Sequence, residues 1–204
     1  MDEQNEVKHP KAVDLGLPSG TKWASCNVGA DQPWKCGGYY AWGETEEKEV
    51  YNEETYIYPK RNELAPDIWF CEDGTFEDFG YCIISTKYDV AYSKWGGNWI
   101  IPTKKHIKEL LEYCVSEWTE LNGVKGRKFT GPNGNSIFLP AGGKLCDSEL
   151  TKLGDMGYYW SGTETPLYYD PLFLRIDSEG AYKNDFCYPR RFNGLSVRPI
   201  IPEY

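Results

Sequence analysis

The stretch "RRFNGLSVRPII", residues 190–201, joins two different patterns close to the end of the chain. Its second half alternates apolar and polar residues, which is typical of a half-buried β-strand. We therefore predict that Leu195 and Val197 belong to a rigid core. The Phe-Asn-Gly sequence before them is typical of a turn. The loop in front of the strand is then expected to present Tyr188, Arg190, Arg191 and Phe192.

The same kind of alternation occurs upstream, in "PLFLRI" at residues 171–176. Leu172, Leu174 and Ile176 alternate with Phe173 and Arg175, which predicts one buried face and one face that displays an aromatic ring and a cation. Shorter β patterns separated by Gly, Asn and Pro turns predict further strands within "AVDLG", "TKWASCNV", "GRKFT", "SIFLPA", "GYYWSGT" and "AYKNDF".

One helix is expected from about Lys104 to Glu117. Thr103 precedes it as an N-cap candidate. Apolar residues then recur at helical spacing, which predicts one core face made of Ile107, Leu110, Leu111, Cys114 and Val115. His106 is interpreted as an ordinary first-turn residue rather than a metal ligand.

The 204 residues fit one domain, which we place at 12–204 after a flexible segment 1–11. The net charge of −9 comes from one region, since twelve acidic and three basic residues lie between Glu44 and Asp78. We interpret 45–98 as an irregular, partly packed acidic insertion. Without a basic stripe to contact phosphates, nucleic acid is not an expected partner.

Seven cysteines and two histidines occur, without a CxxC pair. This pattern gives little support to a zinc site, so neither a metal nor a cofactor is expected. Most cysteines are expected to be free and buried. If the compartment is oxidising, Cys71 and Cys82 are the favoured disulfide pair.

Six separated motifs resemble the Fibrobacter succinogenes major paralogous domain family. They are "VDLGLPSGTKWASCNVGA", "GGYYAWGET", "WGGNWIIPT", "NGVKGRKFTGPNGNSIFLPAGG", "GYYWSGT" and "NGLSVRPI", and they extend from about Ala12 to Ile201. The resemblance implies an α+β, C-type lectin-like fold that is related to the formylglycine-generating enzyme fold. The acidic insertion matches this family least well.

The fold of this family also carries the variable proteins of diversity-generating retroelements in gut Bacteroidetes and their phages. By that likeness, residues 158–201 form a variable ligand-binding region. Scaffold positions there are Trp160, Ser161, Gly194, Ser196, Val197 and Arg198. The expected ligand-contacting residues are Tyr168, Tyr169, Phe173, Tyr182, Asn184, Phe186, Tyr188, Arg190 and Phe192.

Composition favours the same segment independently. Eleven of the last 47 residues of the chain, 158–204, are aromatic, and tyrosine combined with Ser, Asn and Gly is typical of binding surfaces. We therefore expect a non-catalytic display or adhesion module that binds a protein or glycan ligand. The alternative for the aromatic residues is packing in a β-rich core, which we favour for Tyr159 and Trp160.

Other functions stay open as alternatives. Hydrolase, P-loop and dinucleotide motifs are absent, and Cys187 has no neighbouring cysteine that could form a reactive pair. A calcium-dependent lectin would have only "KND" at 183–185 as a ligand motif. A structural surface or fibre module would share the fold without a variable face.

The compartment is expected from the resemblance rather than from a signal. The sequence "MDEQNEVKHP" has no cationic and apolar leader pattern, and no apolar run is long enough to insert directly into a membrane. The family implies a cell-surface or secreted protein whose signal or anchor is absent here. A phage particle or the cytoplasm is the alternative.

Overall fold

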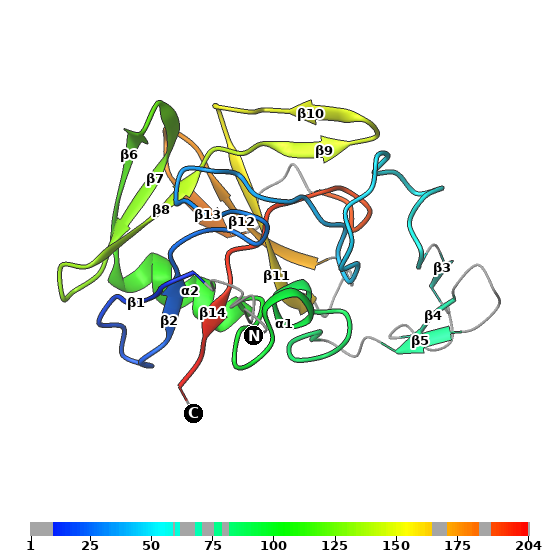
Figure 1. Cartoon of the computed structure of the whole chain (residues 1–204), viewed down its shortest axis with the longest axis horizontal. Coiled ribbons are helices and arrows are strands. Elements are labelled where there is room, and N and C mark those ends of the chain that lie inside the picture. The colour runs from blue at the N-terminus through cyan, green and yellow to red at the C-terminus, as the bar shows by residue number, and fades with distance from the viewer. Residues whose placement is uncertain are drawn as a thin grey trace, which may run out of the picture.

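The computed structural model describes residues 10–58, 82–164, 171–183 and 189–203, together with the backbone of three short strands between residues 60 and 78. In this part of the chain, sixteen elements form five small antiparallel sheets and two helices (Figure 1). The three short strands are β3 (Lys60–Arg61), β4 (Ile68–Phe70) and β5 (Phe76–Asp78), which pair in that order.

The central sheet carries the C-terminal half of the chain. It contains β11 (Gly157–Glu164), β12 (Pro171–Ile176) and β13 (Ala181–Lys183) in the order β11-β12-β13. Trp160 and Phe173, which are partners in register, pack into one core cluster. Tyr159 and Leu174, which are also partners, pack into the other. The two faces of this sheet therefore belong to two different cores.

Phe173 shows the consequence of this position, because it is 0% exposed. The prediction that it lies on a display face is therefore wrong. β12 is the middle strand, and its second face is covered by aromatic residues from the N-terminal half of the chain. Only the end of β12 is partly accessible, at Arg175.

The first core contains side chains from residues 28–58, 83–101 and 145–197. Two tryptophans join these segments through hydrogen bonds as well as packing. The Trp42 indole donates to the Ser161 carbonyl at 2.8 Å, and the Trp160 indole donates to the Tyr40 carbonyl at 2.7 Å. Because Tyr51, Tyr56, Ile83 and Val90 are buried here, both described ends of the acidic segment are integral to the core.

The second core lies between the central sheet, helix α2 (Lys104–Tyr113) and the sheet β6-β7-β8. The strands of that sheet are β6 (Val115–Leu121), β7 (Val124–Thr130) and β8 (Ser136–Pro140). Ile107 and Leu110 from the helix meet Phe129 and Leu139 from the sheet. All four side chains are buried, as apolar helical and strand periodicity requires.

Helix α2 confirms the predicted start but not the predicted end. Thr103 is the N-cap, and its backbone N–H donates to His106 Nδ1 at 3.1 Å, so His106 serves as a capping residue. The helix ends at Tyr113, and Val115 is 77% exposed on strand β6. The prediction that Val115 is a core residue of the helix is wrong, because the chain changes to β structure at Cys114.

Strands from the beginning and end of the described chain pair with each other. β1 (Ala12–Asp14), β2 (Lys22–Ala24) and β14 (Ile200–Ile201) form one sheet in the order β1-β2-β14 (Figure 1). Separately, β9 (Lys144–Cys146) and β10 (Glu149–Thr151) form a hairpin, and Leu145 of β9 bridges to Gly194. Leu195 and Val197 are fully buried, as predicted. The prediction of a half-buried strand is wrong, since residues 194–196 form only isolated bridges and the alternating residues Ser196 and Arg198 are also buried.

Helix α1 (Val90–Trp95) was not expected from the sequence. Its N-cap Asp89 is 0% exposed and accepts the backbone N–H groups of Ala91 at 3.0 Å and Tyr92 at 3.2 Å. Both carboxylate oxygens also accept the N–H of Ile101 at 3.1 Å. Asp89 therefore ties the helix to the segment that enters the second core.

The pH dependence of stability should report on Asp89. Burial raises the pKa of its carboxyl to about 6, although the backbone hydrogen bonds oppose this shift. Because the unfolded-state pKa is about 3.9, the folded protein binds the proton more tightly. The stability contributed by this proton is present below about pH 4 and is lost as the pH rises through about 6.

The measurement compares wild type with Asp89→Asn in urea melts between pH 4 and 7. As the pH rises from 4 to 7, the free energy of unfolding of the wild type should fall by up to about 3 kcal/mol relative to that of Asp89→Asn, since one pKa unit corresponds to about 1.4 kcal/mol. A difference that is constant, or that grows with pH, would contradict this titration.

The described cysteines Cys26, Cys36, Cys82, Cys114 and Cys146 are free thiols. Cys82 therefore does not form the disulfide with Cys71 that was favoured for an oxidising compartment. Cys71 and Cys187 lie outside the described residues. Burial raises the pKa of Cys26, Cys36 and Cys114, so these thiols remain protonated at neutral pH and are weak nucleophiles.

The chain is thus a β-rich α+β protein with two helices in its described part. Neither helix is long and apolar enough to cross a membrane. The C-type lectin-like fold implied by the sequence motifs remains a prediction.

Candidate functional site

The turn at residues 190–193 has a closed, rigid backbone. The Asn193 side-chain oxygen accepts the Arg190 N–H at 2.8 Å, and the Asn193 N–H donates to the Arg190 carbonyl at 2.8 Å. Such local bonds are the reason that asparagine is frequent in turns. Arg190 is exposed on this turn, as predicted.

Arg191 points the opposite way and is only 8% exposed. Its guanidinium bonds the buried Glu164 carboxylate at 3.1 Å and lies 5.4 Å from the centre of the Trp42 ring. The expectation that the loop presents Arg191 is therefore wrong. Two adjacent arginines have different roles because the turn sends successive side chains to opposite sides, and only one side meets a buried carboxylate.

Phe192 occupies an intermediate position. It is partly buried and packs against the first core. The Phe192 ring therefore anchors the turn to the core, and only part of the ring is accessible to a ligand. In contrast, the predicted contact residue Tyr182 on β13 is 36% exposed. Its ring stacks against the Arg175 guanidinium at 4.8 Å, and the two residues are partners in register.

The remaining predicted contact residues lie outside the described part of the chain. They are Tyr168, Tyr169, Asn184, Phe186 and Tyr188. These residues belong to two segments, 165–170 and 184–188, and the neighbouring strands show only where each segment joins the central sheet. Glu164 and Pro171 are partners at one end of the β11-β12 pair. The last residue of β13, Lys183, lies opposite Leu174, toward the same end of the sheet.

Arg190 and the points where segments 165–170 and 184–188 join the sheet lie at the same end of the central sheet. Glu164, at the end of β11, bonds Arg191, which neighbours the exposed Arg190. The attachment points of both undescribed segments and the Arg190 turn therefore belong to one end of the central sheet. Phe173 is not part of this surface, since it is buried in the core below it.

The predicted scaffold residues are all buried. This holds for Trp160, Ser161, Gly194, Ser196, Val197 and Arg198. The backbone of residues 194–196 also bridges several distant segments, with Leu195 bonded to Tyr40, Ser196 next to Tyr159, and Gly194 bonded to Leu145. The base on which the candidate surface stands is therefore fixed from several sides.

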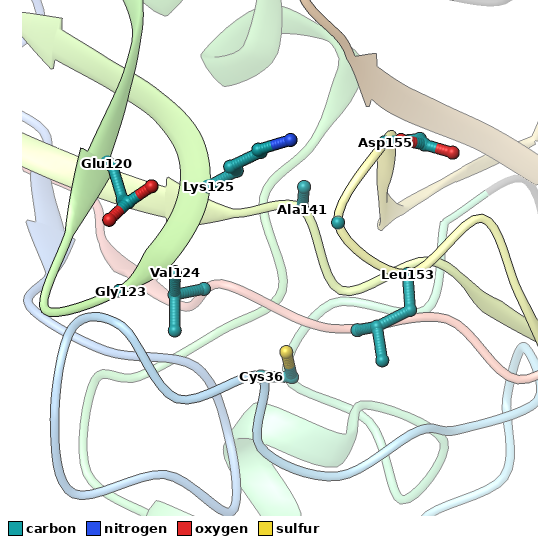
Figure 2. A pocket seen from close by; sticks show the side chains of 9 residues that line it. Cys36, Glu120, Gly123, Val124, Lys125, Ala141, Leu153 and Asp155 are labelled. Carbon is teal, nitrogen blue, oxygen red and sulfur yellow. The ribbon is translucent and has the colours of Figure 1, made fainter.

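Two adjoining hollows, which no sequence pattern indicated, lie on another part of the molecule, and the larger of them is lined by the β12-β13 turn. One has a volume of about 570 Å³ and is lined by residues of β6, β7, the turn 152–156 and the segment 175–179. The second, of about 410 Å³, is shown in Figure 2 and shares Lys125, Gly154 and Asp155 with the first. The unusual signal in the sequence was Trp118, a tryptophan between two glutamates at residues 117 and 120.

No metal site emerges from the described residues. Among them, no group of three or more His, Cys, Asp or Glu side chains is close enough together to hold an ion. The "KND" sequence that a calcium-dependent lectin would use extends into residues that the structure does not describe. His106, the histidine in the described part, is engaged in helix capping, and burial lowers its pKa.

Comparisons of the chain with protein-family models, with curated proteins and with solved structures gave no match. The family resemblance carried by the six sequence motifs therefore remains an expectation.

Proposed function

We propose that this protein is a non-catalytic ligand-binding module at a cell surface or in a secreted form. It holds a protein or glycan ligand at the end of its central sheet where Glu164, Pro171 and the turn 190–193 lie. The observation that carries the proposal is the turn 190–193, in which the exposed Arg190 stands directly beside the buried Arg191. A rigid base under an exposed cation lowers the entropy that binding costs.

The residue types support the same function. Arginine and aromatic residues supply most of the free energy of binding at protein interfaces. Tyr168, Tyr169, Phe186 and Tyr188 lie in the two segments that join the sheet at this end, and Arg190 follows them. A C-type lectin-like scaffold with a variable surface in this region would explain why the base is buried while the flanking segments are aromatic.

The proposed surface can be tested by alanine substitution at Tyr188 and Arg190. Each change should weaken binding by about 1–4 kcal/mol, because interface anchors typically contribute this much. The melting temperature should change little for Arg190→Ala, since this side chain is exposed. The ligand is first identified by exposing the purified protein to glycan arrays and to fractionated bacterial surface proteins, and affinities are then measured by calorimetry.

Val197→Ala is the scaffold control, and it should lower stability because Val197 is fully buried. A combined Tyr168→Ala, Tyr188→Ala and Arg190→Ala variant tests the surface as a whole. Unchanged affinity of this folded triple variant would show that the ligand binds elsewhere and would refute the proposed surface.

A further inference from the structure

We propose a second binding site, for an uncharged oligosaccharide, in the groove formed by the two adjoining hollows. We call it the Trp118 groove, and it lies between the β6-β7 hairpin, the turn 152–156 and the segment 175–179. The volumes of about 570 and 410 Å³ are in the range of small-molecule sites, and the two hollows share the lining residues Lys125, Gly154 and Asp155. The inference does not depend on the C-terminal surface.

One face of the β6-β7 hairpin forms the floor of this groove. Trp118 lies opposite Arg127, and Glu120 lies opposite Lys125. Because partners in register share a face and alternate residues of a strand do too, these four side chains point the same way. In Figure 2 the Lys125 side chain points toward the turn that carries Leu153 and Asp155.

The opposite wall is held rigidly. The buried Arg127 donates to the Asp177 carbonyl at 2.6 Å, which connects the hairpin to the turn after β12. The Asp177 carboxylate bonds Arg175 at 3.0 Å and accepts the N–H groups of Glu179 at 2.9 Å and Gly180 at 3.0 Å. A groove whose walls are joined in this way is largely preformed, as binding sites for small ligands usually are.

The charge of the lining selects the class of ligand. Three basic and three acidic residues line the larger hollow, namely Lys125, Lys152, Arg175, Asp155, Asp177 and Glu179. These charges cancel in the larger hollow, and Glu120 in the smaller one adds a single negative charge, so the groove has no excess of positive charge that would attract a phosphate or a sulfate. The balance favours a ligand without formal charge.

The hydrogen-bonding groups narrow the class further. Within the described residues, Lys125, Lys152, Asp155 and Glu179 form no ion pair, so their charged groups are available to a ligand. Ammonium groups only donate and carboxylates only accept, whereas a hydroxyl group does both. A sugar with neighbouring hydroxyls can therefore satisfy both kinds of group at once.

Trp118 supplies the apolar part of the site. Its ring is partly exposed and lines the larger hollow. An indole presents a broad apolar face, against which the C–H face of a pyranose ring can pack while its hydroxyls bond the charged rim. Together these features fit a neutral oligosaccharide better than a peptide, whose recognition in an open groove uses free strand edges or apolar pockets.

The test uses the full chain on an array of neutral hexose and N-acetylhexosamine oligosaccharides, with sialylated, sulfated and peptide probes on the same array. We expect the wild-type protein to bind neutral oligosaccharides. The dissociation constant for such a ligand should be at least about tenfold higher for Trp118→Ala and for Asp155→Asn. Matched controls outside the groove are Tyr113→Ala, another exposed aromatic, and Lys108→Gln, and both should bind like wild type.

Thermal melts establish that each variant is folded, and Lys125→Gln provides a second, exposed groove variant if Trp118→Ala is unstable. The groove is refuted if no neutral oligosaccharide binds at millimolar concentration, if only anionic or peptide probes bind, or if the groove variants bind normally. A glycan whose binding is lost with Arg190→Ala but kept with Trp118→Ala would support the C-terminal surface and reject the groove. The two proposals can therefore fail separately.

Discussion

Replacing Arg198 by methionine should lower the free energy of unfolding by about 3–5 kcal/mol, because it removes a buried charged group that three acceptors require. Arg198 is 0% exposed. Its guanidinium donates to Asn27 Oδ1 at 2.8 Å, to the Ala24 carbonyl at 3.1 Å and to the Phe138 carbonyl at 2.9 Å. These bonds join the C-terminal segment to β2, to the loop after it and to β8.

Burial lowers the pKa of Arg198, because desolvation disfavours its charged form. Methionine fills a similar volume but donates no hydrogen bond, so the three acceptors would remain buried without their donor. Urea melts of Arg198→Met and of the exposed control Arg190→Met provide the comparison. The control should change stability by less than about 0.5 kcal/mol. Similar losses in the two variants would contradict the structural role of Arg198.

The second large effect is expected at the ion pair of Arg191 and Glu164. Arg191→Met should destabilise the protein by about 3–5 kcal/mol, since it removes a cation that bonds a buried carboxylate. Glu164 is nearly inaccessible and cannot regain its hydration without local unfolding. The bonded groups lie 3.1 Å apart, in a setting where removing one partner costs more than the pair contributes.

A double-mutant cycle separates the cost of an unpaired charge from the value of the pair. Arg191→Met combined with Glu164→Gln should recover a large part of the lost stability, because neither residue then carries a charge. Urea melts of the two single variants and of the double variant give the coupling energy. If the double variant were as unstable as the sum of the single ones, the two groups would not interact.

These two arginines connect stability with the proposed binding function. Arg191 fixes the turn that exposes Arg190, and Arg198 fixes the segment that follows the turn. A surface that contacts a ligand through adjacent segments needs a base that does not move when those segments change. The buried arginines are the groups that would keep such a base in place.

The spacing of apolar residues in the sequence was sufficient to predict which side chains of a regular helix face the core. Ile107 and Leu110 are buried because α2 has a single apolar stripe. Leu195 and Val197 are buried as their apolar character predicts, but the polar residues Ser196 and Arg198 that alternate with them are buried as well. Local turn chemistry was also readable, as in the turn at residues 131–134 between β7 and β8, where the Gly134 N–H donates to Gly131. The aromatic composition of residues 158–204 predicts a binding surface.

Only the tertiary structure decided what covers each face. Alternation in β12 distinguishes two faces but does not say whether the second one meets water, and packing from the N-terminal half buries Phe173. Two adjacent arginines look alike in sequence, and Arg191 is buried because Glu164, 27 residues earlier, lies beside it. The Trp118 groove likewise requires three segments that no local pattern relates. Sequence determines short-range periodicity, whereas burial and charge pairing depend on long-range contacts that only the folded chain creates.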